Sequence, residues 1–176
     1  MDGSRYCRRG SLTTSPWRAR RKRGSGMADE AERVLVSKTL EFPAPADVMW
    51  ETIADFGGLL RWWPSGIEAV DSEGAGRGMM RRLHLAGGRS VSERLAVLEP
   101  ENRVMELELL DGRPAYMRWY FARYEVVPRA SGSALLWSPR CDVEPGTADK
   151  ARGFIEAGWG SVGKGLAAYA QAHAGA

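Results

Sequence analysis

Hydrophobic and polar residues alternate in short runs between residues 34 and 143, and most of these runs end at glycine, proline or asparagine. This pattern predicts β-strands over residues 34–42, 67–73, 78–85, 90–98, 103–110, 116–127 and 134–143. Turn signals such as Gly87-Gly88 and Asp111-Gly112 separate successive runs at hairpin spacing. Hairpins join neighbouring strands in opposite directions, so the pattern indicates an antiparallel sheet.

Two stretches follow helical spacing instead. Residues 46–55 predict a short helix, and a second helical turn over residues 59–63 ends at Pro64. A long helix is predicted over residues 147–173, with Thr147 as its N-cap. Its apolar stripe consists of Ile155, Trp159, Val162, Leu166 and Tyr169. Glycines at 153, 158, 160, 163 and 165 each cost about 1 kcal/mol of helix propensity relative to alanine. We therefore expect packing to support this helix, with small residues letting it lie close to the sheet.

The order of these elements predicts an α+β fold. A curved antiparallel sheet of six to seven strands wraps a long C-terminal helix, and two short helices follow the first strand. A sheet curved around a helix leaves a cavity between them, and such a cavity is the default site for a small molecule.

Positive charge is concentrated in residues 1–26, which hold eight of the 25 basic residues and one of the 22 acidic residues. This segment has no apolar period, so we expect a disordered basic tail before a ligand-binding domain over residues 27–176. Met27 resembles a second natural start, whereas a nucleic-acid, membrane-surface or targeting role for the tail is the alternative. The rest of the chain has an acidic excess, which disfavours nucleic-acid binding by the domain.

Composition excludes several other classes of protein. No apolar run reaches the roughly 18–20 residues that span a bilayer, and the N-terminus lacks the apolar stretch of a secretory signal. Two cysteines and two histidines are too few for a disulfide scaffold or a cysteine–histidine metal site. We expect a cytoplasmic monomer or homodimer with no metal, no cofactor and no integral membrane association.

The familiar phosphate-binding and catalytic motifs do not assign an activity to this chain. Gly158-Trp-Gly160-Ser-Val-Gly163 matches a G-x-G-x-x-G phosphate-binding pattern, but it lies inside one helical stripe near the end of the chain. Such a loop requires a preceding strand and a following helix. No serine lies in a G-x-S-x-G elbow, and His84 is expected at an exposed or rim position.

Two charged residues fall on apolar strand faces. Arg81 shares a face with Leu83, and Glu93 shares one with Leu95. If residues 86–88 form the hairpin loop, Arg81 lies opposite Glu93. An unpaired charge is costly to bury, so we expect the two to pair inside the cavity. The pair is either a structural ion pair that closes one end of the core or a group that orients a ligand.

Aromatic residues supply the second candidate set for the cavity wall. Trp62-Trp63-Pro64 lies at the predicted mouth, between the second short helix and the next strand, where Trp63 suits a stacking ligand. We expect the cavity to be bordered by Trp63, Tyr116, Trp119, Trp137 and Trp159.

Several segments resemble the START-like (SRPBCC) superfamily, and in particular its bacterial polyketide cyclase/dehydrase-like branch. The matching segments, in the family's order, are Pro45–Trp50, Asp55–Pro64, Gly78–Arg81, Ser92–Leu95, Leu98–Pro100 and Leu135–Trp137. The resemblance covers roughly residues 34–173. It implies the helix-grip fold and a cavity for apolar or aromatic small molecules.

The Ser92–Leu95 strand is also similar to that of the plant abscisic-acid receptors, in which its glutamate faces the ligand. That likeness implies a gate loop containing Gly87 and Gly88 and a latch loop containing Arg113 and Pro114. The chain departs from the receptor pattern at the latch, because Ala-Tyr follows Pro114 where an Asn-Tyr pair is common.

Two main functions follow from the resemblance. The first is binding of a small hydrophobic, lipid- or polyketide-like molecule in the cavity. The alternative is a cofactor-independent cyclase or dehydratase with Glu93, Arg81 and a cavity tyrosine as acid–base groups. A coat or chaperone role through the basic tail is a third hypothesis, and the identity of the ligand stays open.

Overall fold

The computed structural model describes residues 30–63 and 66–174. The predicted basic tail and its boundary at Met27 lie outside these residues. In chain order the elements are β1 (Glu32–Leu35), β2 (Lys38–Phe42), α1 (Ala46–Ala54), η1 (Leu59–Arg61), β3 (Ile67–Glu73), β4 (Met80–Leu85), β5 (Arg89–Glu99), η2 (Pro100–Asn102), β6 (Val104–Asp111), β7 (Met117–Arg129), β8 (Gly132–Val143) and α2 (Ala148–Ala172).

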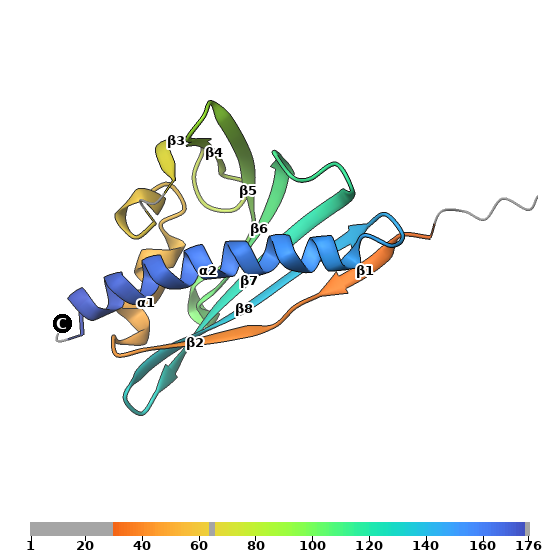
Figure 1. Cartoon of the computed structure of the whole chain (residues 1–176). Coiled ribbons are helices and arrows are strands. Elements are labelled where there is room, and N and C mark those ends of the chain that lie inside the picture. Colours follow the sequence, from red (N-terminus) through yellow and green to blue (C-terminus); the bar gives the residue numbers. More distant parts are fainter. Residues whose placement is uncertain (1–29, 64–65, 175–176) are drawn as a thin grey trace, which may run out of the picture.

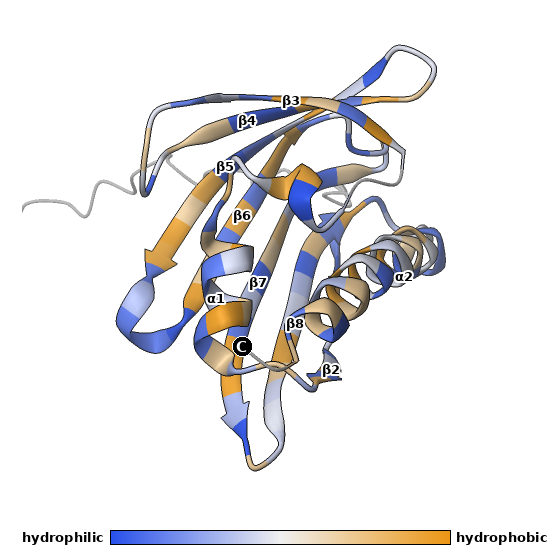
Figure 2. Cartoon of the chain, turned by 90° about the vertical axis from the view of Figure 1, so that its left-hand side faces the viewer, coloured by the Kyte–Doolittle hydropathy of each residue, from blue (hydrophilic) through white to orange (hydrophobic). Residues whose placement is uncertain are grey.

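The strands form one antiparallel sheet in the order β1-β8-β7-β6-β5-β4-β3, with β2 also paired to β8. Each strand from β3 to β7 pairs with the next one along the chain, as the turn signals predict. The sheet curves around α2, and α1 and η1 lie between β2 and β3 (Figures 1 and 2). The predicted helix-grip fold is confirmed.

The first predicted strand is divided in two, which raises the number of strands to eight. Leu35 pairs with Arg140 and Lys38 pairs with Trp137. Between these pairs the chain passes Pro139, whose carbonyl accepts the amide of Val36 at 3.1 Å. Proline has no N–H to return a second bond, so the ladder is interrupted there.

The long helix packs on the concave face of the sheet through a stripe of small and aliphatic residues. Its buried residues are Ala151, Ile155, Val162, Leu166 and Ala170. Trp159 and Tyr169, which we expected in the stripe, flank it and are only half-buried. Thr147 stands at the N-cap, but its hydroxyl donates to the Glu144 carbonyl instead of capping a helix amide. Neither helix of the described chain combines the length and apolarity of a bilayer span.

As expected, α2 packs on the sheet, against β1, β2 and β8, and at Gly165 its backbone also lies against Trp62, the C-cap residue of η1. A Cβ atom added at Gly165 would lie 2.2 Å from the carbonyl oxygen of Trp62, which is far inside contact distance. At Gly153, Gly158 and Gly160 an added Cβ would meet nothing within 4 Å. Of the five glycines, Gly165 is therefore the one that allows the helix to pack closely against the segment containing Trp62 and Trp63.

Candidate functional site

A cavity of about 290 Å³ lies between the concave face of the sheet and α2. This volume is at the lower end of the range for small-molecule pockets. Aliphatic and aromatic side chains form most of its wall: Trp63, Ile67, Leu83, Leu85, Val91, Leu107, Leu109, Ala122, Trp137, Phe154 and Val162. Its polar side chains are Arg89, Glu93, Tyr120, Tyr124 and Ser161. The cavity therefore suits a small apolar body with a few polar groups.

Arg81 and Glu93 form the ion pair that the hairpin spacing predicts. The two residues are direct partners across β4 and β5, and Arg81 Nε donates to Glu93 Oε2 at 2.6 Å. Arg81 is 4% exposed, donates from Nη1 to the Phe56 carbonyl at 2.8 Å, and lies 4.0 Å from the centre of the Phe56 ring. Glu93 lines the cavity, whereas Arg81 is not among its lining residues. Arg81 therefore fixes the position of the Glu93 carboxylate without itself lining the cavity.

Two tyrosines of β7 stand in the same wall as Glu93. Burial, reinforced by the charge of Glu93, raises the pKa of Tyr124 to about 12. Burial likewise raises the pKa of Tyr120 well above its usual range. Both phenols therefore remain neutral at physiological pH and can donate hydrogen bonds. The buried Trp137 indole acts in the opposite direction, because its hydrogen-bonding interaction with Tyr124 lowers the pKa of that phenol.

Trp119, which we expected in the cavity, lies on the outer face of the sheet. Its indole donates to Asp142 at 3.0 Å, and the Arg33 guanidinium lies 5.5 Å from the centre of its ring. A β-bulge between Met117 and Trp119 changes the alternation of side chains along β7. The residues that point inward after the bulge are Tyr120, Ala122, Tyr124 and Val126.

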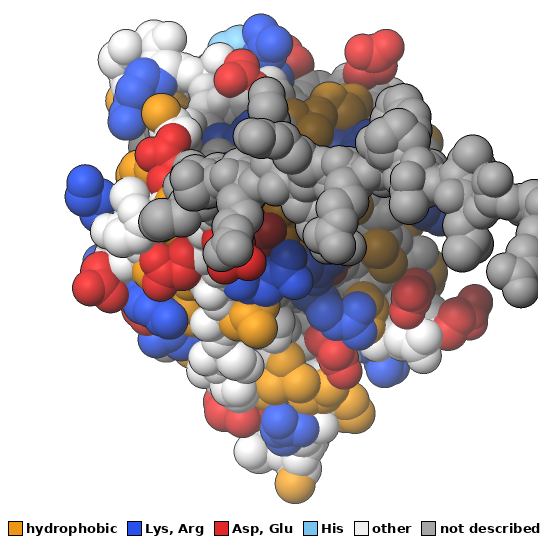
Figure 3. All heavy atoms as spheres, turned by 90° about the vertical axis from the view of Figure 1, so that its right-hand side faces the viewer, with side chains coloured by type: hydrophobic (Ala, Val, Ile, Leu, Met, Phe, Trp, Pro, Cys, Tyr) orange, Lys and Arg blue, Asp and Glu red, His pale blue; other side chains and the backbone are white. Residues whose placement is uncertain are grey.

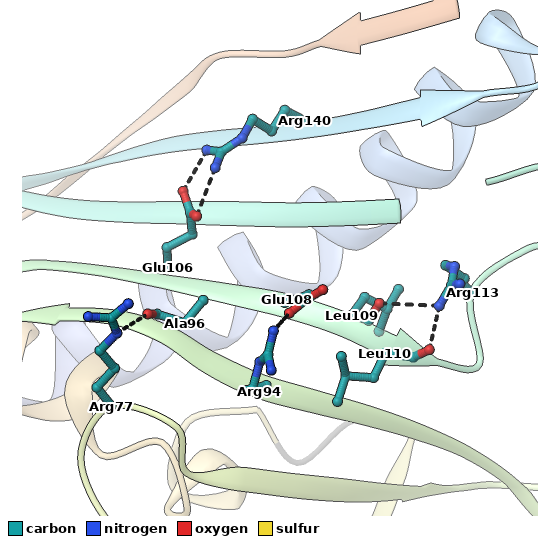
Figure 4. Close-up of polar contacts among 9 residues, drawn as sticks. All are labelled: Arg77, Arg94, Ala96, Glu106, Glu108, Leu109, Leu110, Arg113 and Arg140. Atoms are coloured by element: carbon teal, nitrogen blue, oxygen red, sulfur yellow. Dashed lines mark hydrogen bonds and ion pairs between the residues drawn. The ribbon is translucent and has the colours of Figure 1, made fainter. Parts of the chain in front are cut away.

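The outer face carries a separate set of ion pairs (Figure 4). Arg140 makes two bonds to Glu106, at 2.5 and 2.8 Å, and Arg94 pairs with Glu108. His84, predicted at an exposed or rim position, contacts Asp71 at 2.7 Å. These charges satisfy one another on the solvent side, so the inward residues are the ones available to a ligand.

Of the other four aromatic residues predicted to border the cavity, two line it and two do not. Trp63 and Trp137 line the cavity as expected. Trp159 stacks on Trp137 with ring centres 5.2 Å apart, and the hydroxyl of Tyr116 donates to the Lys150 carbonyl at 3.2 Å. Neither of these two is among the described lining residues. Tyr120 and Tyr124 take their place, and the period-two alternation of Tyr120, Ala122, Tyr124 and Val126 is the signal that would have found them.

The two loops implied by the receptor likeness border the cavity through neighbouring residues. Gly87 and Gly88 form the exposed tip of the β4–β5 turn with φ of +81° and +74°, and the next residue, Arg89, reaches the cavity wall. In the β6–β7 connection Gly112 reaches the wall. Arg113 donates to the Leu110 carbonyl (Figure 4) and also to the Met117 carbonyl, which ties this loop to its own strands. Pro114 accepts the Met117 amide at 2.9 Å.

A family model described as polyketide cyclase / dehydrase and lipid transport matches residues 33–172 of the chain. Among curated proteins no sequence matches significantly.

Several solved structures share the fold. Norcoclaurine synthase from Thalictrum flavum, in complex with dopamine and hydroxybenzaldehyde, is 17% identical with a TM-score of 0.71, over 95% of this chain and 98% of that one. XoxI from Bacillus cereus is 22% identical with a TM-score of 0.65, over 80% and 95%. The Zhui aromatase/cyclase from Streptomyces sp. R1128 is 23% identical with a TM-score of 0.62, over 80% and 94%.

Proposed function

Because the chain belongs to the polyketide cyclase / dehydrase and lipid transport family, we propose that it binds a small, largely apolar or aromatic molecule between the sheet and α2. The single observation that carries this proposal is the composition of the cavity wall. Aliphatic and aromatic side chains form most of the wall, and its polar groups are one carboxylate, two neutral phenols, the Arg89 guanidinium and the Ser161 hydroxyl. Apolar walls stabilise a ligand by removing its surface from water, while a few fixed polar groups set its orientation.

The polar groups favour a ligand that carries hydroxyl or carbonyl oxygens. Tyr120 and Tyr124 donate to a ligand oxygen because their phenols stay protonated. Glu93 accepts from a ligand hydroxyl through the oxygen that Arg81 does not engage. Polyketide-like aromatics carry both kinds of group on an apolar frame.

Binding is favoured over the cyclase or dehydratase alternative. That chemistry would require Glu93 to take a proton, with a tyrosine as the acid. Arg81 already occupies Glu93 Oε2 at 2.6 Å and is itself anchored to the Phe56 carbonyl. This arrangement holds the carboxylate in place as a hydrogen-bond acceptor, which is the role that ligand orientation requires.

Gly158 provides a direct test, because it lines the cavity and has open space where a Cβ would be. We expect Gly158→Leu to fill the cavity and weaken binding of the neutral probe N-phenyl-1-naphthylamine by about tenfold or more, measured by fluorescence titration. Gly160→Leu is the matched control, because Gly160 lies on the same helix, is exposed and also has free space. Absence of probe binding to the unsubstituted protein, or equal losses in both variants, would contradict the proposal.

A further inference from the structure

A second hollow lies outside the cavity, between the segment Arg61–Trp63 and the C-terminal half of α2. Its volume is about 640 Å³. The described residues that line it are Arg61, Trp62, Trp63, Ser161, Lys164, Gly165, Ala168, Tyr169, Ala172 and His173. We call this hollow the η1–α2 groove. It exists because Gly165 lets the helix backbone approach Trp62, which sets the two segments side by side.

The groove is rich in hydrogen-bond donors and positive charge. Arg61 and Lys164 line it, and no acidic side chain stands among its described lining residues. Arg61 is paired with Asp55, whereas Lys164 forms no ion pair within the described part of the chain. The indole nitrogens of Trp62 and Trp63 are buried without a hydrogen-bond partner there, and Trp62 is only 4% exposed. A groove lined by an unpaired lysine and by no acidic side chain among its described residues is suited to an anion.

The groove and the cavity share a wall. Trp63 and Ser161 line both spaces, so the two lie on either side of the Trp63 side chain. The cavity side carries Arg89 and Glu93, the latter already paired with Arg81, whereas Lys164 lines the groove without an acidic neighbour among the described lining residues. A carboxylate buried among the largely apolar side chains of the cavity wall would lose its hydration, which is costly. An acidic group is therefore favoured on the groove side and an apolar group on the cavity side.

We propose that the η1–α2 groove binds the carboxylate of an amphipathic ligand whose apolar part passes Trp63 into the cavity. The ligand class is a medium-chain fatty acid or an aromatic acid of similar length. This inference rests on the proposed function and adds to it a charged end and the place where that end is held. Lys164 supplies a free cation, and the side chains of Trp62 and Trp63 line the same groove.

The test compares decanoate with 1-decanol, which differ in the charged group and share the apolar chain. We expect the full chain to bind decanoate about tenfold or more tightly, by displacement of N-phenyl-1-naphthylamine at neutral pH. Lys164→Met should remove this preference and leave the affinity for 1-decanol unchanged. Lys150→Met is the matched control, because Lys150 is an exposed lysine on the same helix outside the groove.

Three outcomes would overturn the inference, and they separate it from the proposed function. Equal binding of decanoate and 1-decanol, both lost in Gly158→Leu, would keep the cavity and reject the charged end. Loss of the preference in Arg89→Gln but not in Lys164→Met would place the carboxylate inside the cavity, which Arg89 also lines. Binding of neither ligand and of no neutral probe would reject the cavity function itself.

Discussion

The Arg81–Glu93 pair shows how one side chain prepares another for a ligand. Arg81 is almost fully buried, and its guanidinium is divided among Glu93, the Phe56 carbonyl and the Phe56 ring. Those contacts leave the carboxylate of Glu93 in one position on the cavity wall. Structural and ligand-orienting roles are therefore compatible in this pair, since the first positions the group that performs the second.

Arg81→Met should lower the free energy of unfolding by about 3–5 kcal/mol, because it leaves Glu93 buried without its counter-charge. Arg81→Met combined with Glu93→Leu should recover much of that loss, and urea denaturation of both variants measures the difference. A change within about 0.5 kcal/mol for the single variant is what a surface substitution gives. Such a result would show that the pair is solvated and would contradict its burial.

Tyr124 makes stability sensitive to high pH. Its pKa is raised to about 12 in the folded protein, so above pH 10 the unfolded chain loses this proton first. Stability should then fall as pH rises from 10 to 12, by about 3 kcal/mol at most from this one group. Tyr124→Phe should remove that part of the slope in urea denaturation series. A stability difference between the two proteins that stays constant from pH 8 to pH 12 would contradict the assignment.

At the scale of elements, α2 has a low helix propensity but packs closely against the Trp62 backbone at Gly165. Most of its glycines face open space and only weaken the helix, whereas Gly165 makes room for the Trp62 carbonyl. Gly158 has a different consequence, because its missing side chain leaves volume in the cavity. Glycine therefore allows close backbone packing at position 165 and leaves cavity volume at position 158.

Alanine substitutions in α2 should separate these roles. Gly153→Ala and Gly160→Ala are expected to raise the free energy of unfolding by about 0.5–1 kcal/mol, because alanine is the better helix former and its Cβ meets nothing. Gly165→Ala should lower it instead, because the new Cβ would stand 2.2 Å from a backbone oxygen. Chemical denaturation of the three variants checks the signs. Stabilisation by Gly165→Ala would show that α2 and the Trp62 backbone are not in close contact at this position.

At the scale of the whole molecule, the described elements form one sheet-and-helix unit that begins at Glu32. On the face in Figure 3 the visible acidic and basic side chains are interspersed. The concentration of positive charge in residues 1–26 is a property of the sequence outside that unit.

A chain that begins at Met27 should keep the thermal unfolding midpoint and the probe affinity of the full chain. The reason is that residues 1–26 have no apolar pattern with which to pack on the domain. Differential scanning fluorimetry and N-phenyl-1-naphthylamine titration of both chains measure the two properties. A drop of several degrees would show that the tail contributes to the folded unit and that the boundary at residue 27 is wrong.

Local pattern was sufficient for the order of the elements and for one contact inside the site. Turn residues and alternation define each hairpin, and a three-residue loop with strict alternation forces Arg81 opposite Glu93. Both depend only on neighbouring residues, because side chains of a strand alternate between faces and a hairpin loop sets the register. The amphipathic stripe of α2 is local in the same sense.

Tertiary structure decided that Trp119 is excluded from the ligand space, whereas Trp63 and Trp137 line the cavity as the sequence predicted. The bulge in β7 turns Trp119 outward and brings Tyr120 and Tyr124 inward, and a bulge depends on pairing with another strand. The seat of Gly165 against Trp62 and the η1–α2 groove join segments about one hundred residues apart. No local period encodes such contacts, because they arise when separate elements pack together. The sequence by itself therefore determined the fold and the buried ion pair, while long-range packing decided the composition of the cavity wall.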